Sequence, residues 1–107
     1  MSDIGRTQNT NDEANIPSSI TLNATTSTKI ADANTRRIFF HVNNNTASDA
    51  IWIKLQAASV DNDKKGIYLQ KKDLPDGRWQ MPPDNIYTGE ISAIADSGTP
   101  DVFVTEY

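Results

Sequence analysis

The sequence has 107 residues, the length of one small domain, and its 36% of hydrophobic residues can form a single core but leave much of the chain as surface, loop or extension. Fourteen acidic and ten basic residues give a net charge of −4, and the basic residues form no block or stripe, which argues against a nucleic-acid partner. Cysteine is absent and no long apolar run begins the chain, so disulfides and thiolate metal sites are excluded, and we expect neither a secretory signal nor a membrane partner.

The first 18 residues are mostly polar, and Met1, Ile4 and Ile16 are their only large apolar residues. Such a segment cannot by itself bury enough apolar area to offset the entropy that it loses on ordering. We interpret residues 1–18 as an extended arm that lies on a neighbouring subunit or partner, with Ile4, Arg6 and Ile16 as candidate partner-binding residues. The alternative is an arm that folds back on its own domain.

Two short segments with alternating apolar residues follow the arm. Residues 19–23 place Ile20 and Leu22 on one face, and residues 28–31 are centred on Ile30. Both segments predict short strands, because alternate residues of a strand lie on the same face of a sheet.

Residues 36–55 have the strongest strand pattern and form the expected centre of the fold. β-branched and aromatic residues are concentrated in residues 36–43 and again in residues 50–55. The residues expected to share a core face are Ile38, Phe40 and Val42 in the first run and Ile51, Ile53 and Leu55 in the second. The linking residues 44–49 are polar, which predicts two neighbouring antiparallel strands joined as a hairpin.

Four further strands are expected in the second half of the chain. They are residues 66–70, 78–81, 89–95 and 102–107. The last two flank the polar residues 96–101, which predicts a terminal hairpin with a loop of about six residues. With about eight short strands, residues 19–107 are expected to form an all-β domain, either a small antiparallel β-sandwich or a jelly-roll-like barrel.

No residue pattern indicates a catalytic site. The single histidine, His41, lies in a predicted strand without a Gly-x-Ser-x-Gly turn elsewhere, so we expect it on the outer face or in a subunit contact. Asp61 and Asp63 faintly resemble the start of a calcium loop, but two lysines follow them, and a solvated turn is the better interpretation. Glycine motifs that cradle phosphate are absent. We therefore expect a protein that is not an enzyme and that holds no metal or cofactor.

Two interpretations remain open for four of the aromatic residues. These residues are Trp52, Tyr68, Trp79 and Tyr87. They could form a platform that stacks on sugars; alternatively, Trp79 covers the core and Trp52 lies in a subunit contact, because interfaces are enriched in Trp and Tyr. The basic pairs at 36–37 and 71–72 are expected to be solvated or salt-bridged ends of strands, although an acidic surface could also use them.

Three segments carry a family resemblance. They are Arg36-Arg37-Ile38-Phe39-Phe40-His41-Val42-Asn43, Ala50-Ile51-Trp52-Ile53-Lys54-Leu55 and the terminal residues 84–107, which include Tyr87-Thr88-Gly89-Glu90-Ile91-Ser92-Ala93-Ile94. Together they resemble small virion structural proteins of tailed bacteriophages. The resemblance covers residues 20–107, leaves the arm outside, and is shared by head-decoration, neck and tail-fibre-base proteins. It implies no catalytic residue.

The resemblance implies a head-decoration, or cement, protein of the virion that is assembled in the host cytoplasm. Such proteins form homo-oligomers on the outside of the head, bind the major capsid protein and bridge neighbouring capsid subunits. On this expectation the arm docks along the capsid protein, and the candidate apolar anchors on the face opposite the core are Trp52, or Phe39 and Phe103. A neck or tail-fibre attachment module is the first alternative, and a carbohydrate-binding module is the second.

Overall fold

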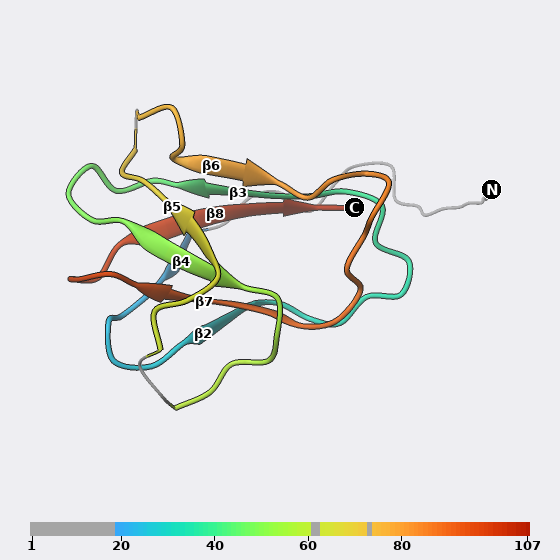
Figure 1. Ribbon diagram of the computed structural model, residues 1–107, viewed down its shortest axis with the longest axis horizontal. Helices are drawn as coiled ribbons and strands as arrows, with labels where there is room; N and C mark the ends of the chain where they lie inside the picture. Colours follow the sequence, from blue (N-terminus) through green and yellow to red (C-terminus); the bar gives the residue numbers. More distant parts are fainter. Residues whose placement is uncertain (1–18, 61–62, 73) are drawn as a thin grey trace.

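The computed structural model describes residues 19–60, 63–72 and 74–107, and these residues form an all-β fold (Figure 1). The eight strands are β1 (Ser19–Thr21), β2 (Thr28–Ala31), β3 (Phe40–Asn44), β4 (Ile51–Lys54), β5 (Ile67–Leu69), β6 (Arg78–Gln80), β7 (Ile91–Ala95) and β8 (Asp101–Glu106). Each predicted strand is therefore confirmed, with ends that differ by a few residues. The predicted arm, with Ile4, Arg6 and Ile16, lies outside the described residues. No helix long and apolar enough to cross a bilayer occurs in the part of the chain that the structure describes.

The strands form two four-stranded antiparallel sheets that pack face to face as a β-sandwich. One sheet has the order β1-β8-β3-β6 and is called the β3 sheet here; the other has the order β2-β7-β4-β5 and is called the β7 sheet. Figure 1 shows the two layers, with β6, β3 and β8 in the upper one and β4, β7 and β2 in the lower one. The predicted fold class is thus confirmed.

The core lies between the sheets and is filled by alternate residues of the strands. Phe40 and Val42 of β3 face Ile51 and Ile53 of β4 across the interior, and all four side chains are fully buried. Burying each such side chain stabilises the fold by about 1.5–3 kcal/mol. Trp79 of β6 packs against this core and meets the Phe40 ring edge-on, with the ring centroids 6.4 Å apart. The prediction that Trp79 covers the core is therefore confirmed.

The predicted hairpin between residues 36–43 and 50–55 is wrong. β3 pairs with β6 and β8, whereas β4 pairs with β5 and β7, so the two strands belong to opposite sheets. The link between them crosses the end of the sandwich and is held by Asn44, which is fully buried. Its side-chain amide donates to the Asp49 carbonyl at 2.8 Å and to the Gln70 carbonyl at 3.0 Å. Two strands that contribute apolar residues to one core from opposite sheets show the same alternation as two neighbouring strands of one sheet. The alternation therefore could not distinguish a crossing from a hairpin.

The predicted terminal hairpin is wrong for the same reason. β7 is a central strand of the β7 sheet, and β8 pairs with β1 and β3 in the other sheet. The link between them crosses the sandwich at Pro100, whose carbonyl accepts a hydrogen bond from the Leu22 backbone N–H at 2.9 Å. The Asp101 backbone N–H donates to the Thr46 hydroxyl at 2.8 Å, which joins this crossing to the β3–β4 crossing.

Two residues expected in the core are exposed. Ile38 is 67% exposed because β3 begins only at Phe40, and Leu55 is 39% exposed because β4 ends at Lys54. Each lies one or two positions beyond the paired strand, so the alternation that holds within the strand no longer sets the direction of its side chain.

Candidate partner-binding face

The outer side of the β3 sheet carries a row of aromatic and polar side chains. Along β3 the side chains of Phe40 and Val42 are buried, so those of His41 and Asn43 point to the other side. In β8 the buried Val102 is followed by Phe103, which is only partly buried. We call this surface the aromatic face. Its residues are Phe39, His41, Asn43, Arg78, Gln80, Phe103, Thr105 and Tyr107.

The strand register brings these residues together from three strands. Asn43 lies opposite Phe103 of β8 and opposite Arg78 of β6, so these three side chains form one row across the sheet. His41 lies opposite Thr105 and Gln80 in the next row. Directly opposite side chains in an antiparallel sheet are about 4.5–5.5 Å apart at Cβ, which makes each row a continuous surface.

Three stacked rings close one end of the aromatic face. The Phe39 ring is stacked on Tyr107 with centroids 4.8 Å apart and on His41 with centroids 6.5 Å apart. The Phe39 N–H donates to the Tyr107 carbonyl at 2.9 Å, and the Tyr107 N–H donates to the Phe39 carbonyl at 3.2 Å. Tyr107 is 45% exposed and the neighbouring Ile38 is 67% exposed. This end therefore presents apolar surface to solvent.

His41 titrates on the aromatic face under the influence of its neighbours. Partial burial lowers the pKa of His41 below 6.5, and the positive charge of Arg78 lowers it further. The residues around it are Phe39, Arg78, Gln80 and Thr105. None of these is an acid, and no described side chain forms a hydrogen bond with the imidazole, so the arrangement does not resemble a nucleophile-activating histidine.

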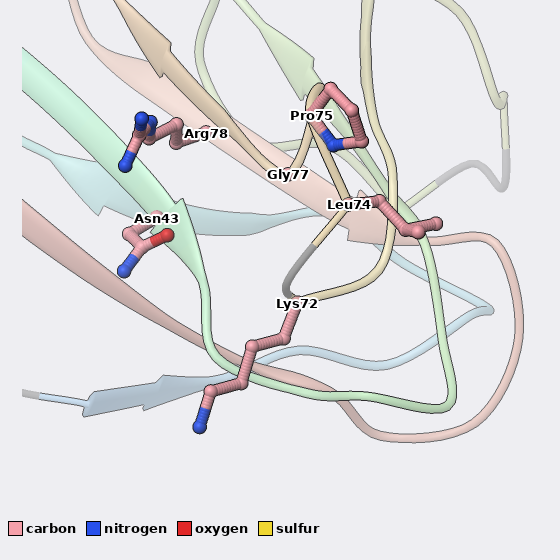
Figure 2. Close-up of a pocket in the computed structure, with 6 residues that line it drawn as sticks. All are labelled: Asn43, Lys72, Leu74, Pro75, Gly77 and Arg78. Carbon is pink, nitrogen blue, oxygen red and sulfur yellow. The ribbon is translucent and has the colours of Figure 1, made fainter.

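A hollow of about 360 Å³ adjoins the aromatic face, beside the turn that joins β5 to β6. It is lined by Asn43, Lys72, Leu74, Pro75, Gly77 and Arg78 (Figure 2). Figure 2 shows the terminal nitrogens of Asn43, Lys72 and Arg78 on one side of the view and Leu74 and Pro75 on the other. The hollow thus has a polar, positively charged wall and an apolar wall.

Trp52 lies on the opposite side of the molecule from Phe39 and Phe103. It belongs to β4 in the β7 sheet. Because Ile51 and Ile53 on either side of it are buried, its side chain points to the outer side of the sheet. The Trp52 ring contacts Tyr68 with centroids 4.8 Å apart and planes tilted by 59°, and its indole N–H donates to the Asp96 carboxylate at 3.3 Å. The three apolar anchors expected from the sequence therefore divide between two outer faces.

The described residues offer no site for metal chemistry. No group of three or more His, Cys, Asp or Glu residues is close enough to hold a metal ion in the part of the chain that the structure describes. Asp61, half of the weak calcium pattern, lies outside that part, while Asp63 lies near Lys65, with 3.7 Å between carboxylate and ammonium.

Sequence reasoning overlooked Tyr107 and Arg78 as members of the aromatic face. Tyr107 could have been found from β8 alone, because residues 103, 105 and 107 alternate with the buried Val102. Arg78 could not, since its place beside Asn43 depends on the pairing of β3 with β6.

Comparison with known proteins identifies no relative: no protein-family model, curated protein or solved structure matches this chain. The geometry itself indicates what the molecule can do. A sheet face with half-buried aromatic rings, bordered by a charged hollow, is suited to adhesion, because aromatic and arginine side chains supply much of the binding energy of protein interfaces.

Proposed function

We propose that the protein is a non-catalytic structural component of a bacteriophage virion, a head-decoration protein that binds the major capsid protein from outside and bridges neighbouring subunits. The resemblance of residues 36–43, 50–55 and 84–107 to small phage virion proteins supports the phage assignment. The observation that carries the adhesive role is the aromatic face, where Phe39, Phe103 and Tyr107 lie on the side of the β3 sheet away from the core.

The physical basis of the proposed function is multivalent attachment. Each copy adds a modest apolar interface, and a homo-oligomer that engages several capsid subunits at once raises the effective concentration of every further contact. Interfaces of this kind place Phe and Tyr at their centre and polar residues at their rim. The aromatic face combines both kinds of residue, with Asn43, Gln80 and Thr105 beside the rings.

The test compares the two outer faces on heads purified without the protein. The variant Phe39→Ser/Phe103→Ser removes the two rings from the aromatic face, and Trp52→Ala alters the opposite face as the matched control. Removal of an interface hot spot costs about 2 kcal/mol or more, which corresponds to about 30-fold weaker binding. We expect the double variant to lose head occupancy by about this factor and Trp52→Ala to retain it. Equal occupancy for both variants contradicts the assignment of the binding face.

The role of residues 1–18 is tested on the same heads. We expect protein lacking these residues to remain folded but to leave the heads, because the proposed arm supplies contacts along the capsid protein. The arm proposal fails if the truncated protein decorates heads at the occupancy of the full chain.

Copy number separates head decoration from the alternative of a neck or tail-fibre attachment module. A decoration protein covers a shell of many subunits and is present in hundreds of copies per particle, whereas a neck or fibre module follows the low symmetry of the tail and is present in a few to a few tens. Quantitative mass spectrometry of purified particles distinguishes the two ranges.

A carbohydrate-binding module is the second candidate, and the contact between Trp52 and Tyr68 on the outer side of the β7 sheet favours it. Trp79 cannot take part, because it packs against the core. If this candidate is right, a glycan array binds the folded protein and Trp52→Ala abolishes the signal while Phe39→Ser leaves it unchanged. The decoration proposal predicts no such glycan signal.

A further inference from the structure

We propose that the hollow beside Asn43 receives a carboxylate side chain of the protein partner that covers the aromatic face. This inference rests on the proposed function, since it specifies the chemistry of the partner surface. The residue that enters the hollow is an aspartate or glutamate of the partner, and it is followed there by an apolar residue.

The hollow and the aromatic face form one continuous surface. Asn43 and Arg78 belong to both, because they lie directly opposite each other in β3 and β6 and also line the hollow. Phe103 flanks Asn43 on its other side. If a segment of the partner packs on Phe103, its next side chains can therefore reach the hollow.

Two cations of the hollow, Lys72 and Arg78, have no acidic partner among the described residues. Elsewhere in the described chain, Arg37 pairs with Glu106 at 2.6 Å, and Lys29 pairs with Asp32 at 2.6 Å. No described residue forms an ion pair or a side-chain hydrogen bond with the Arg78 guanidinium or the Lys72 ammonium. Charge complementarity therefore points to an anion supplied from outside the chain.

The wall that carries these cations is held by backbone hydrogen bonds. The Lys72 N–H donates to the Thr46 carbonyl at 2.9 Å, and the Asn44 N–H donates to the Gly77 carbonyl at 2.9 Å, so the turn is fastened to the β3–β4 crossing. Within the turn, the Gly77 N–H donates to the Leu74 carbonyl at 3.0 Å. These bonds fix the backbone at Lys72 and Gly77, which lowers the part of the ordering entropy of binding that comes from the backbone.

The chemistry favours a carboxylate over a nucleic-acid backbone. Arginine presents a planar fork that matches a carboxylate, and the Asn43 amide adds one more donor. A polyphosphate chain needs a longer stripe of cations, whereas this protein has a net charge of −4 and only two cations here. Leu74, which is 45% exposed, and Pro75 offer apolar contact to the neighbouring residue of the partner.

The test uses isotope-labelled full-length protein and NMR titration with the blocked peptide acetyl-Ala-Glu-Leu-amide. Its matched control peptide has Gln in place of Glu. We expect saturable shifts at the Arg78 Nε–H and the Asn43 side-chain amide with the Glu peptide. The Gln peptide should bind about tenfold more weakly, because it lacks the negative charge that strengthens the hydrogen bonds. Inorganic phosphate at the same concentration should bind no more tightly than the Glu peptide.

The variants Arg78→Gln and Lys72→Gln should each weaken binding of the Glu peptide by about tenfold, whereas Lys71→Gln and Arg36→Gln should leave it unchanged because neither residue lines the hollow. Equal binding of the two peptides, tighter binding of phosphate, or unchanged affinity in both hollow variants overturns the inference. Head occupancy is a separate readout: if the Glu peptide binds the hollow but the full chain does not bind heads, the decoration proposal fails and the carboxylate site stands.

Discussion

Arg37 is a charged side chain held entirely within the protein. Its Nε donates to the Glu106 carboxylate at 2.6 Å, and its two terminal nitrogens donate to the carbonyls of Tyr87 at 2.6 Å and Asp32 at 2.7 Å. The guanidinium also lies 5.3 Å from the Phe40 ring centroid, within the range of a cation–π contact. Arg37 thus ties together three chain segments at one end of the sandwich. The sequence predicted only a solvated or salt-bridged strand end.

Replacement of Arg37 by Met should lower the free energy of unfolding by about 3–5 kcal/mol, because removal of one partner leaves the shielded Glu106 carboxylate without its counter-charge. The neighbouring Arg36 is exposed, and Arg36→Met should change stability by less than about 0.5 kcal/mol. Urea denaturation of both variants measures the difference. Similar losses in the two variants would contradict the structural role of Arg37.

Titration of His41 should make stability depend on pH. Its folded pKa lies below the unfolded value of 6.5, so the unfolded chain binds the proton more tightly. The contribution of His41 is therefore fully present above pH 6.5 and is lost as the pH falls from there through the folded pKa. We expect His41→Gln to reduce the loss of stability measured by urea denaturation between neutral pH and that lower range.

The same titration can separate the two causes of the shift. NMR titration of the imidazole should show that Arg78→Gln raises the pKa of His41 but leaves it below 6.5, since burial is the larger cause and the Arg78 charge the smaller. A pKa that does not move in Arg78→Gln would place the guanidinium away from His41.

At the scale of single elements, the β3–β4 and β7–β8 crossings between the sheets depend on buried polar contacts. Asn44 not only donates two hydrogen bonds but also accepts one from the Thr46 N–H at 3.0 Å. It heads one of the two Asn-x-Thr sequences of the chain, and its burial agrees with a structural role for that residue. Asn23 heads the other, and its side-chain oxygen Oδ1 accepts hydrogen bonds from the Thr25 and Thr26 N–H groups at 3.0 and 2.8 Å, which stabilises the turn after β1.

Gly66 makes the start of β5 possible. Its φ of 115° is rarely adopted by L side chains, and an added Cβ would collide with the Ile53 carbonyl oxygen of the neighbouring β4. Gly66→Ala should therefore destabilise the protein by at least about 1–3 kcal/mol, the cost of the backbone conformation alone. Thermal and urea denaturation measure this loss.

Gly98 is the second glycine with a positive φ, and it serves as the comparison for Gly66. Its φ of 69° is a left-handed conformation that costs other residues about 1–2 kcal/mol, and an added Cβ would meet only the movable Asp49 side chain. Gly98→Ala should therefore cost less than Gly66→Ala. The reverse order would show that the β4–β5 contact is less rigid than the crossing between β7 and β8.

For the whole molecule, the described strands β1 to β8 share one core. Every one of these strands has a hydrogen-bonded neighbour, and the buried core residues among the described ones all belong to the segment 22–102. If residues 1–18 act on a neighbour or partner, their deletion should change the free energy of unfolding by no more than about 0.5 kcal/mol, as for changes away from the core. A larger loss in urea denaturation would favour an arm that packs on its own domain.

The sequence by itself determined which segments become strands, since alternation and β-branched composition are local properties that survive in any pairing. It also determined that Phe40, Val42, Ile51 and Ile53 would be buried, and that Phe103 would share a strand with core residues. These predictions needed no knowledge of the neighbouring strand.

Only the tertiary structure decided which strands lie side by side. The hairpins expected at 36–55 and 89–107 are crossings between sheets. The apolar residues of a strand are buried equally well in either sheet of a sandwich, so their pattern does not specify the sheet. That choice separated Trp52 from Phe39 and Phe103 and brought Arg78 beside Asn43. Both the aromatic face and the hollow arise from long-range pairing, and the physical reason is that local periodicity specifies a strand's buried side but not its partner.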